Sequence, residues 1–449
     1  MKEKILIVGA GLCGTLMAIR MAQRGYRVEL REKRPDMRLE EIPAGRSINL
    51  ALSNRGLKAL RLVGMDEQIK KMCIPMYGRM IHPLGGTPWL SEYSGRAGDF
   101  INSVSRPGLN MALLNKAEEY DNLEIKFHSE CTRVDLENAI GFFKNKNDAT
   151  EEVKADIIIG ADGAGSAVRR SLMARSSDLL FNFSQQFLRH GYKELSIPPA
   201  EGGGWRIEKN ALHIWPRGGY MTIALPNLDG SFTVTVFHPF EGEAGFKKLT
   251  DPETLFYFFE KEYPDLLQHI PNFIDEFYSN PTGTLGIIKC YPWQAFGKTL
   301  ITGDAAHAIV PFYGQGMNAA FEDVSVFDQI LNDHNGDWEK TFSAFQDCRV
   351  ENTNAIADLA VDNFYEMRDH VDNPVFIAKR NLERKLEQTF PDYYSKYSLV
   401  TFNENMPYRE AMLKGRKQDE LLKEICQRPG YEKISLEEIY REIKSQVKY

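Results

Sequence analysis

The sequence lacks several features that define common protein classes. Its six cysteines show neither the spacing of a zinc knuckle nor that of a redox dithiol. No stretch is long and apolar enough to form a membrane anchor, and the N-terminus lacks the apolar core of a signal peptide. These absences favour a cytoplasmic protein with reduced thiols and no bound metal.

An excess of positive charge is also missing. The 55 Lys and Arg residues stand against 62 Asp and Glu residues, which gives a net charge of −7. A nucleic-acid-binding protein needs a basic face, so we expect no nucleic acid as a partner. The hydrophobic share of 43% is ordinary for a globular chain, and 449 residues indicate two or three domains.

The N-terminus has the pattern of a strand, a helix and a second strand. Residues 4–8 form a nearly continuous apolar run, which is typical of a parallel strand buried on both faces. Helical spacing follows over residues 16–24 and stops at Gly25, and residues 26–32 fit a second strand. We therefore expect a βαβ unit.

The turn of this unit carries the motif Gly9-Ala10-Gly11-Leu12-Cys13-Gly14. Its glycines permit a tight turn, a close approach to a pyrophosphate and close packing of helix against strand. The helix N-terminus adds free N–H groups and a positive dipole end. Glu32 closes the second strand, where a carboxylate can accept hydrogen bonds from ribose hydroxyls; a solvated strand end is the competing interpretation. The motif predicts a dinucleotide site without distinguishing FAD from NAD(P).

Two later glycine-rich segments each follow a predicted buried strand. Residues 160–169 contain Asp162 and follow a strand at 155–160. Residues 303–307 contain Asp304, follow a strand at 299–304, and lead to a helix beginning near Gly316. Taken singly, Asp304 fits a turn cap and His307, which has no evident partner, fits a packed core histidine. All three segments in this order are hard to explain by chance.

The rest of the chain changes character twice. Residues 53–63 and part of 102–120 are expected to be helical. Residues 212–215, 220–225 and 231–237 are β-rich and separated by turn signals, which predicts an antiparallel sheet. From Asp337 onward nearly everything is charged and helical.

The three glycine segments resemble those of the group A flavoprotein aromatic hydroxylases. The resemblance implies bound FAD and NADPH as a co-substrate without a separate NADPH domain. It implies that Asp304 binds the ribityl chain, that backbone N–H groups at Gly316-Met317-Asn318 face the flavin pyrimidine, and that Asp162 lies near FAD. The full set of cofactor residues implied is Gly9, Gly11, Cys13, Gly14, Arg31, Glu32, Lys33, Arg34, Ala51, Arg106, Cys131, Asp162, Ala167, Asp304, Gly316, Met317 and Asn318.

Four further stretches resemble the members of that family that hydroxylate L-kynurenine. They are residues 45–53, Arg79–His82 with Tyr93, Leu212–Arg217, and Asn363–Arg368 with Tyr397. The resemblance implies that Arg79, Tyr93, Asn363 and Tyr397 hold the amino-acid end of the substrate. A guanidinium can clamp a carboxylate through two parallel hydrogen bonds. Without the resemblance, a surface arginine and ordinary tyrosine packing are the better interpretations.

The implied reaction converts L-kynurenine to 3-hydroxy-L-kynurenine with NADPH and O2, through a C4a-hydroperoxyflavin, in tryptophan degradation and NAD biosynthesis. No acid–base residue is expected to be obligatory, because the cofactor carries the chemistry. An apolar wall over the aniline ring is expected from Leu212, Met221, Ile223 and Phe237. The alternatives are a related phenol hydroxylase, halogenase or prenyl-chain reductase, and a binding protein without turnover. A homodimer stays open.

The implied fold class is α/β, with a Rossmann-like FAD-binding domain, an antiparallel β-sheet substrate domain and a C-terminal helical region. The expected divisions are FAD-binding domain at 1–75, 100–178 and 285–335; a substrate-domain excursion at 76–99; the β-sheet substrate domain at 179–284; and helices covering the active site at 336–449.

Overall fold

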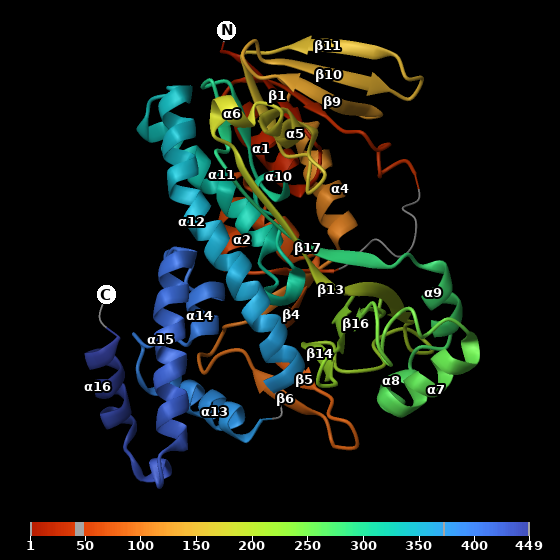
Figure 1. Ribbon diagram of the computed structural model, residues 1–449, viewed down its shortest axis with the longest axis vertical. Helices are drawn as coiled ribbons and strands as arrows, with labels where there is room; N and C mark the ends of the chain where they lie inside the picture. Colours follow the sequence, from red (N-terminus) through yellow and green to blue (C-terminus); the bar gives the residue numbers. More distant parts are fainter. Residues whose placement is uncertain (1, 41–48, 371–372, 448–449) are drawn as a thin grey trace.

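A six-stranded sheet of mostly parallel strands organises the N-terminal part of the molecule (Figure 1). The computed structural model describes residues 2–40, 49–370 and 373–447. The strand order is β18 (Gln294–Ala295), β19 (Thr299–Ile301), β12 (Ile157–Gly160), β1 (Lys4–Val8), β2 (Arg27–Arg31) and β8 (Leu123–Lys126). Because β1, β2, β12 and β19 run parallel, their carboxyl ends meet at one edge of the sheet.

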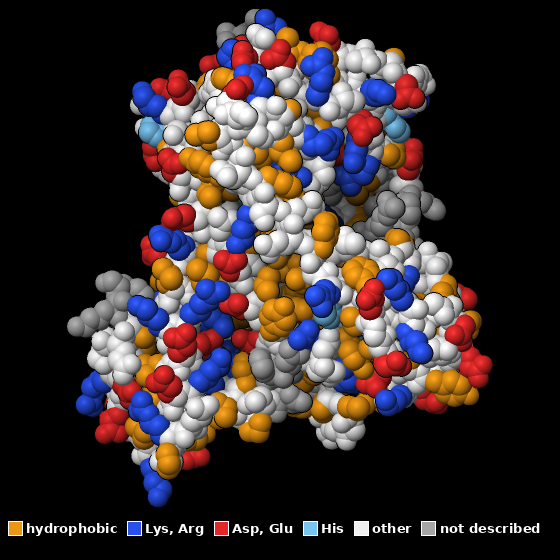
Figure 2. Space-filling view, in the orientation of Figure 1, with side chains coloured by type: hydrophobic (Ala, Val, Ile, Leu, Met, Phe, Trp, Pro, Cys, Tyr) orange, Lys and Arg blue, Asp and Glu red, His pale blue; other side chains and the backbone are white. Residues whose placement is uncertain are grey.

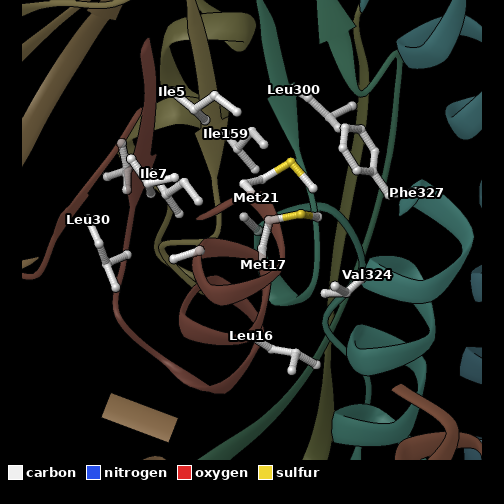
Figure 3. Packing of buried hydrophobic residues seen from close by; sticks show 14 of the residues in the cluster. Ile5, Ile7, Leu16, Met17, Met21, Leu30, Ile159, Leu300, Val324 and Phe327 are labelled. Carbon is white, nitrogen blue, oxygen red and sulfur yellow. The ribbon is translucent and has the colours of Figure 1, made fainter. Parts of the chain in front are cut away.

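Helices cover this sheet through a continuous apolar core. The helices involved are α1 (Leu12–Gln23), α2 (Asn54–Leu62), α4 (Arg106–Ala117), α5 (Ala167–Met173) and α11 (Gly316–Asp333). Figure 3 shows Met17 and Met21 of α1 beside Ile159 of the sheet, with Phe327 of α11 in the same cluster. All four side chains are fully buried, which fixes α1 and its preceding glycine turn against the sheet.

A second sheet of seven strands lies below the first in Figure 1. Its order is β17 (Gly283–Tyr291), β13 (Asn182–Ile197), β16 (Phe232–Pro239), β15 (Met221–Pro226), β14 (Ala211–Pro216), β5 (Gly78–Ile81) and β6 (Trp89–Glu92). Its side chains alternate between two cores. Val236 packs toward α7 (Pro252–Glu262), α8 (Pro264–Leu267) and α9 (Phe273–Ser279), whereas Phe237 packs on the opposite face, toward the C-terminal helices.

Two small sheets complete the β structure. One consists of β3 (Leu50–Leu52), β7 (Ile101–Val104) and β4 (Cys73–Met76). The other consists of β9 (Ser129–Asp135), β10 (Ile140–Asn145) and β11 (Thr150–Lys154), and it lies at the far end of the molecule from the last helices of the chain, those after residue 373 (Figure 1).

The C-terminal third is helical and touches both large sheets. Its elements are α12 (Trp338–Tyr365), the π-helical turn Glu366–His370, α13 (Pro374–Thr389), α14 (Lys396–Thr401), α15 (Tyr408–Gln427) and α16 (Leu436–Gln446). Phe342 and Phe345, near the start of α12, belong to the core of the first sheet, and Phe364 near its end belongs to the core under the second. Within the described ranges, none of the helices is long and apolar enough to cross a membrane.

The structure confirms most of the expected elements and adds several. The predicted strands at 4–8, 26–32, 155–160 and 299–304, the three middle strands and the helices at 53–63 and within 102–120 are all present. The long strand β13, the sheet β9–β11 and the helices α7–α9 were not predicted. The proposed domain divisions stay a prediction; β17 crosses the one placed after residue 284, because it pairs with β13 as far as Tyr291.

Candidate active site

A cavity of about 480 Å³ opens between the carboxyl ends of the parallel strands and the inner face of the seven-stranded sheet. Residues from both sheets and from the C-terminal helices line it. Seventeen of the predicted site residues are among them: Gly9, Gly11, Cys13, Arg31, Glu32, Lys33, Arg34, Ala51, Arg79, Arg106, Cys131, Asp162, Ala167, Asp304, Gly316, Met317 and Tyr397. The cavity therefore joins the predicted cofactor end to the predicted substrate end.

The glycine turn after β1 forms a cradle for an extended group. Gly9 has φ +101°, and a Cβ there would lie 2.5 Å from the backbone oxygen of Ala161. Gly14, which does not line the cavity, would clash with the Gly9 carbonyl, so it serves close helix–strand packing. A Cβ on Gly11 would meet nothing within 4 Å, and α1 begins at the next residue. This open space before a helix N-terminus suits a pyrophosphate.

Glu32 faces this turn from the end of β2. One carboxylate oxygen accepts from the backbone N–H of Ala10 at 2.9 Å, and the other accepts from Arg34 Nε at 2.8 Å. Burial opposes ionisation, but these bonds outweigh it and lower the pKa of Glu32. The carboxylate is therefore ionised and placed to accept from a hydroxyl group, so the solvated strand end is the wrong interpretation.

Arg31 is held by other protein groups. Its guanidinium contacts Glu29 at 2.6 Å, Glu151 at 2.7 Å and Ser129 Oγ at 3.1 Å, and it lies over the ring of Phe143. The side chain ties β2 to the β9–β11 sheet and has its donors engaged. Its contribution to a cofactor stays a prediction, and the structure assigns it a packing role in this arrangement.

Asp304 is the first residue of a short helix, and Asp162 lies in the loop that precedes another. Asp162 accepts at 2.6 Å from the backbone N–H of Ala167, the first residue of α5, whose N-cap is Ser166; burial raises the pKa of Asp162. Asp304 begins α10 (Asp304–His307), and its side chain is exposed at the cavity wall. The Asp304 carboxylate is therefore available to bind a ligand, whereas the carboxylate of Asp162 already accepts hydrogen bonds from the backbone.

His307 has a partner, contrary to expectation. Its Nε2 lies 2.6 Å from Oδ2 of Asp323, a residue that sequence reasoning missed. The same oxygen accepts from the N–H of Gly303, and Oδ1 accepts from Arg349 Nε at 2.8 Å. Burial disfavours the Asp323 carboxylate, but His307 and Arg349 hold its pKa well below the ordinary value. This buried network anchors the turn that presents Asp304.

Only part of the predicted segment at the start of α11 lines the cavity, and its role toward a flavin stays a prediction. Gly316 and Met317 line the cavity, whereas Asn318 is buried behind it. Asn318 Nδ2 donates to the carbonyls of Ala51 and Gly314 at 2.8 and 2.7 Å. The side chain of Asn318 thus joins β3 to α11 and sets the position of the helix N-terminus.

The four predicted substrate residues come together at the other end of the cavity. Arg79 Nη2 lies 3.5 Å from Asn363 Oδ1, and Asn363 Nδ2 donates to the carbonyl of Phe312 at 2.6 Å, which fixes the amide. The rings of Tyr93 and Tyr397 stack at 5.1 Å, with the Arg79 guanidinium 5.1 Å from the Tyr397 centroid. Asn363 and Tyr93 stand behind the wall rather than lining it.

Burial decides between the interpretations of these residues. Arg79 is only 9% exposed, so it is not a surface arginine, and its Nε has no hydrogen-bond partner within the described part of the chain. No described carboxylate pairs with its guanidinium at salt-bridge distance. A buried, incompletely paired cation is costly unless an anion from outside completes it.

The apolar wall is largely as expected. Leu212, Ile223 and Phe237 line the cavity, whereas Met221 is buried in the core behind it. Leu225 and Met367 also contribute and were not predicted. Leu225 follows Ile223 by two residues and so faces the same side of β15, a signal that strand alternation in the sequence already contained.

The stretch at residues 45–53 lies partly outside the described residues, which resume at Asn49. Lys33, Arg34, Arg106 and Cys131 line the cofactor end. Burial raises the pKa of the Cys131 thiol to about 12, so the thiol is neutral there.

Comparison with known proteins agrees with this geometry. A family model described as an FAD binding domain matches residues 2–179 and 290–336. The chain is 44% identical to the kynurenine 3-monooxygenase of Myxococcus xanthus over 99% of its length and 96% of the relative. It is 41% identical to that of Christiangramia forsetii over 96% of each chain.

Among solved structures, a tetrameric form of 2-methyl-3-hydroxypyridine-5-carboxylic acid oxygenase superposes with a TM-score of 0.64 at 20% identity, covering 86% of this chain and 97% of the other. This likeness confirms the fold class, in which an FAD-binding α/β domain accompanies a β-sheet domain. Identity over nearly the full length is the more specific finding. Together they show that the chain belongs to the kynurenine 3-monooxygenase family of FAD-dependent aromatic hydroxylases.

Proposed function

We propose that this enzyme uses NADPH and O2 to hydroxylate L-kynurenine to 3-hydroxy-L-kynurenine, with FAD held in the cavity. The observation that carries the proposal is the cluster of Arg79, Asn363 and Tyr397 at one end of a cavity whose other end is a nucleotide cradle. A substrate with an aromatic ring and a charged amino-acid tail matches both the apolar wall and the buried cation.

The Arg79 guanidinium binds the substrate carboxylate. The amide of Asn363 orients Arg79 from one side, and the ring of Tyr397 lies beneath it. Burial raises the pKa of the Tyr397 hydroxyl, so this group stays a hydrogen-bond donor at neutral pH. Charge-assisted bonds of this kind fix orientation as well as affinity.

The apolar wall positions the aniline ring and excludes water. Leu212, Ile223 and Phe237 come from three strands of one rigid sheet, so their relative placement is set by strand pairing. FAD, when bound, supplies the electron acceptor for NADPH and the site of oxygen activation. At the cofactor end, the Gly11 turn would hold the pyrophosphate and Glu32 would accept from a ribose hydroxyl. Asp304 would bind the ribityl chain, and the α11 N-terminus would meet the flavin ring.

The decisive experiment uses purified protein with its natural flavin. We expect a flavin absorption spectrum, NADPH oxidation that L-kynurenine accelerates, and 3-hydroxy-L-kynurenine as the product by mass spectrometry. Kynurenine-independent NADPH oxidation with hydroxylation of a simple phenol would favour a related hydroxylase. A colourless protein without NADPH oxidation would favour a binding protein.

The same proposal includes a cytoplasmic location and admits a homodimer. All six cysteines are free thiols, as expected in a reducing compartment. Cell fractionation and analytical ultracentrifugation measure the two properties.

A further inference from the structure

One buried hydroxyl at the cavity wall has no role in the site described so far. Tyr313 lies in the short 3₁₀ turn Pro311–Tyr313, between the Asp304 turn and the start of α11. Its side chain lines the cavity, yet it is only 4% exposed. Its Oη forms no hydrogen bond to any residue that the structure describes.

The surroundings of Tyr313 hold this hydroxyl in place. Its ring stacks on that of Tyr397 at 5.5 Å with an interplanar angle of 13°, and Tyr397 also stacks on Tyr93. The preceding residue, Phe312, packs against Phe364 at 4.2 Å, and its carbonyl is bound by Asn363. The Tyr313 ring therefore has little freedom to turn the hydroxyl elsewhere.

A buried hydroxyl without a partner costs about 1–3 kcal/mol, so native proteins rarely leave one. The Oη of Tyr313 is such a hydroxyl, and the Nε of Arg79 is likewise a buried polar atom without a partner among the described residues. Both residues line the same cavity. Burial raises the pKa of the Tyr313 hydroxyl well above its ordinary value, so the group keeps its proton and can donate a hydrogen bond. Both groups can donate a hydrogen bond, so an acceptor oxygen on a bound ligand would satisfy each of them.

We propose that Tyr313 is a further substrate-binding residue, whose hydroxyl donates a hydrogen bond to an oxygen on the amino-acid side chain of the substrate. The inference rests on the proposed function and deepens it. L-kynurenine offers two such oxygens, the ketone and the carboxylate. Tyr313 stacks on Tyr397, whose ring also lies beside the Arg79 guanidinium, so the hydroxyl is near the predicted carboxylate site and either oxygen is a candidate acceptor.

The test is Tyr313→Phe, which removes only the hydroxyl. Equilibrium binding is measured by the change in the flavin spectrum of the FAD-loaded protein, with FAD content measured in parallel. We expect L-kynurenine affinity to fall about three- to tenfold while FAD content stays unchanged. Tyr393→Phe is the matched control, because Tyr393 is 2% exposed with an unpartnered hydroxyl but lies outside the cavity wall.

Two further ligands identify the oxygen. If the variant also loses affinity for the decarboxylated amine of kynurenine, the ketone accepts the bond. If it instead loses affinity for the analogue with a methylene in place of the ketone, the carboxylate accepts it. Affinity for L-kynurenine within twofold of wild type, or an equal loss for Tyr393→Phe, would overturn the inference and leave the proposed function intact. Failure of the wild type to bind L-kynurenine would overturn both.

Discussion

At the scale of single residues, the largest expected effect on substrate binding is that of replacing Arg79. The change Arg79→Met keeps most of the apolar stem and removes the charge and paired donors. We expect a loss of about 2–4 kcal/mol in L-kynurenine binding, or roughly thirtyfold to a thousandfold, because the carboxylate loses a charge-assisted contact in a buried site. Binding titrations of the FAD-loaded protein measure it.

The decarboxylated amine provides the control for this prediction. It lacks the group that Arg79 is proposed to hold, so wild type and variant should bind it almost equally. Arg384→Met is the control variant, because Arg384 pairs with Glu92 at 2.9 Å on the surface. Equal losses for both ligands would show that Arg79 does not recognise the carboxylate.

At the cofactor end, the corresponding prediction concerns Asp304 and the affinity for FAD. Its side chain is exposed at the cavity wall. Replacing Asp304 with Ala should weaken FAD binding about tenfold to a hundredfold, since a hydrogen bond to a charged group contributes about 1.5–3 kcal/mol. Flavin fluorescence titration of the apoprotein measures the dissociation constant. Asp333→Ala, at the far end of α11, should leave it unchanged, and an unchanged value for Asp304→Ala would refute the assignment.

At the scale of elements, the joint between β19, α10, α11 and α12 depends on Asp323. This carboxylate binds Thr302, Gly303 and His307 and also pairs with Arg349. Asp323→Asn keeps the shape and removes the charge, so the buried Arg349 guanidinium keeps only Glu322 as a counter-ion and the contact with His307 is weakened. We expect unfolding free energy to fall by about 3–5 kcal/mol, measured by urea denaturation of the apoprotein.

Measuring FAD retention separates an effect of Asp323→Asn on the position of Asp304 from an effect on the stability of the fold. Gly303 has φ +58° and precedes Asp304 directly, so relaxation of the joint should displace Asp304. We expect the folded Asp323→Asn variant to release FAD more readily than wild type at temperatures where both are folded. Wild-type stability and FAD release in this variant would show that neither the turn nor the fold depends on the Asp323 charge.

At the scale of the whole molecule, buried neutral histidines make stability depend on pH. Burial lowers the pKa of His238 to about 3 and that of His213 to about 4. The unfolded chain takes up these protons near pH 6.5, whereas the folded chain does not until far lower pH. Stability from these residues is therefore complete above about pH 6.5 and is lost as the pH falls toward their folded pKa values.

We expect the urea midpoint to be lower at pH 5.0 than at pH 7.5. Each buried histidine should lower the free energy of unfolding by on the order of 2 kcal/mol over this range. His238→Gln should flatten this dependence, because the variant has one fewer group to protonate. His334→Gln, at the C-terminal cap of α11, serves as the comparison. A steeper or unchanged slope in His238→Gln would contradict the account.

At the same scale, the face of the molecule in Figure 2 carries charges of both signs. Figure 2 shows Lys and Arg interspersed with Asp and Glu over the face it presents, without segregation into one sign. This pattern accords with the net charge of −7.

The sequence alone determined the elements whose signals are local. The apolar run at 4–8, the glycine turn and the strand ending at Glu32 specified the βαβ unit, because periodicity and glycine placement act within a few residues. Strands β14, β15 and β16 were equally predictable from turn signals between them. The position of Asp304 at the end of a buried strand followed from the same reasoning.

Only the tertiary structure decided which residues meet. Arg79 and Asn363 are 284 residues apart and come together because the end of α12 packs on one face of the seven-stranded sheet, to which β5 belongs. The pairing of His307 with Asp323 and the engaged guanidinium of Arg31 also depend on the packing of different elements. A sequence pattern fixes the local backbone, but the partners of a buried polar group are set by whatever the rest of the fold places beside it.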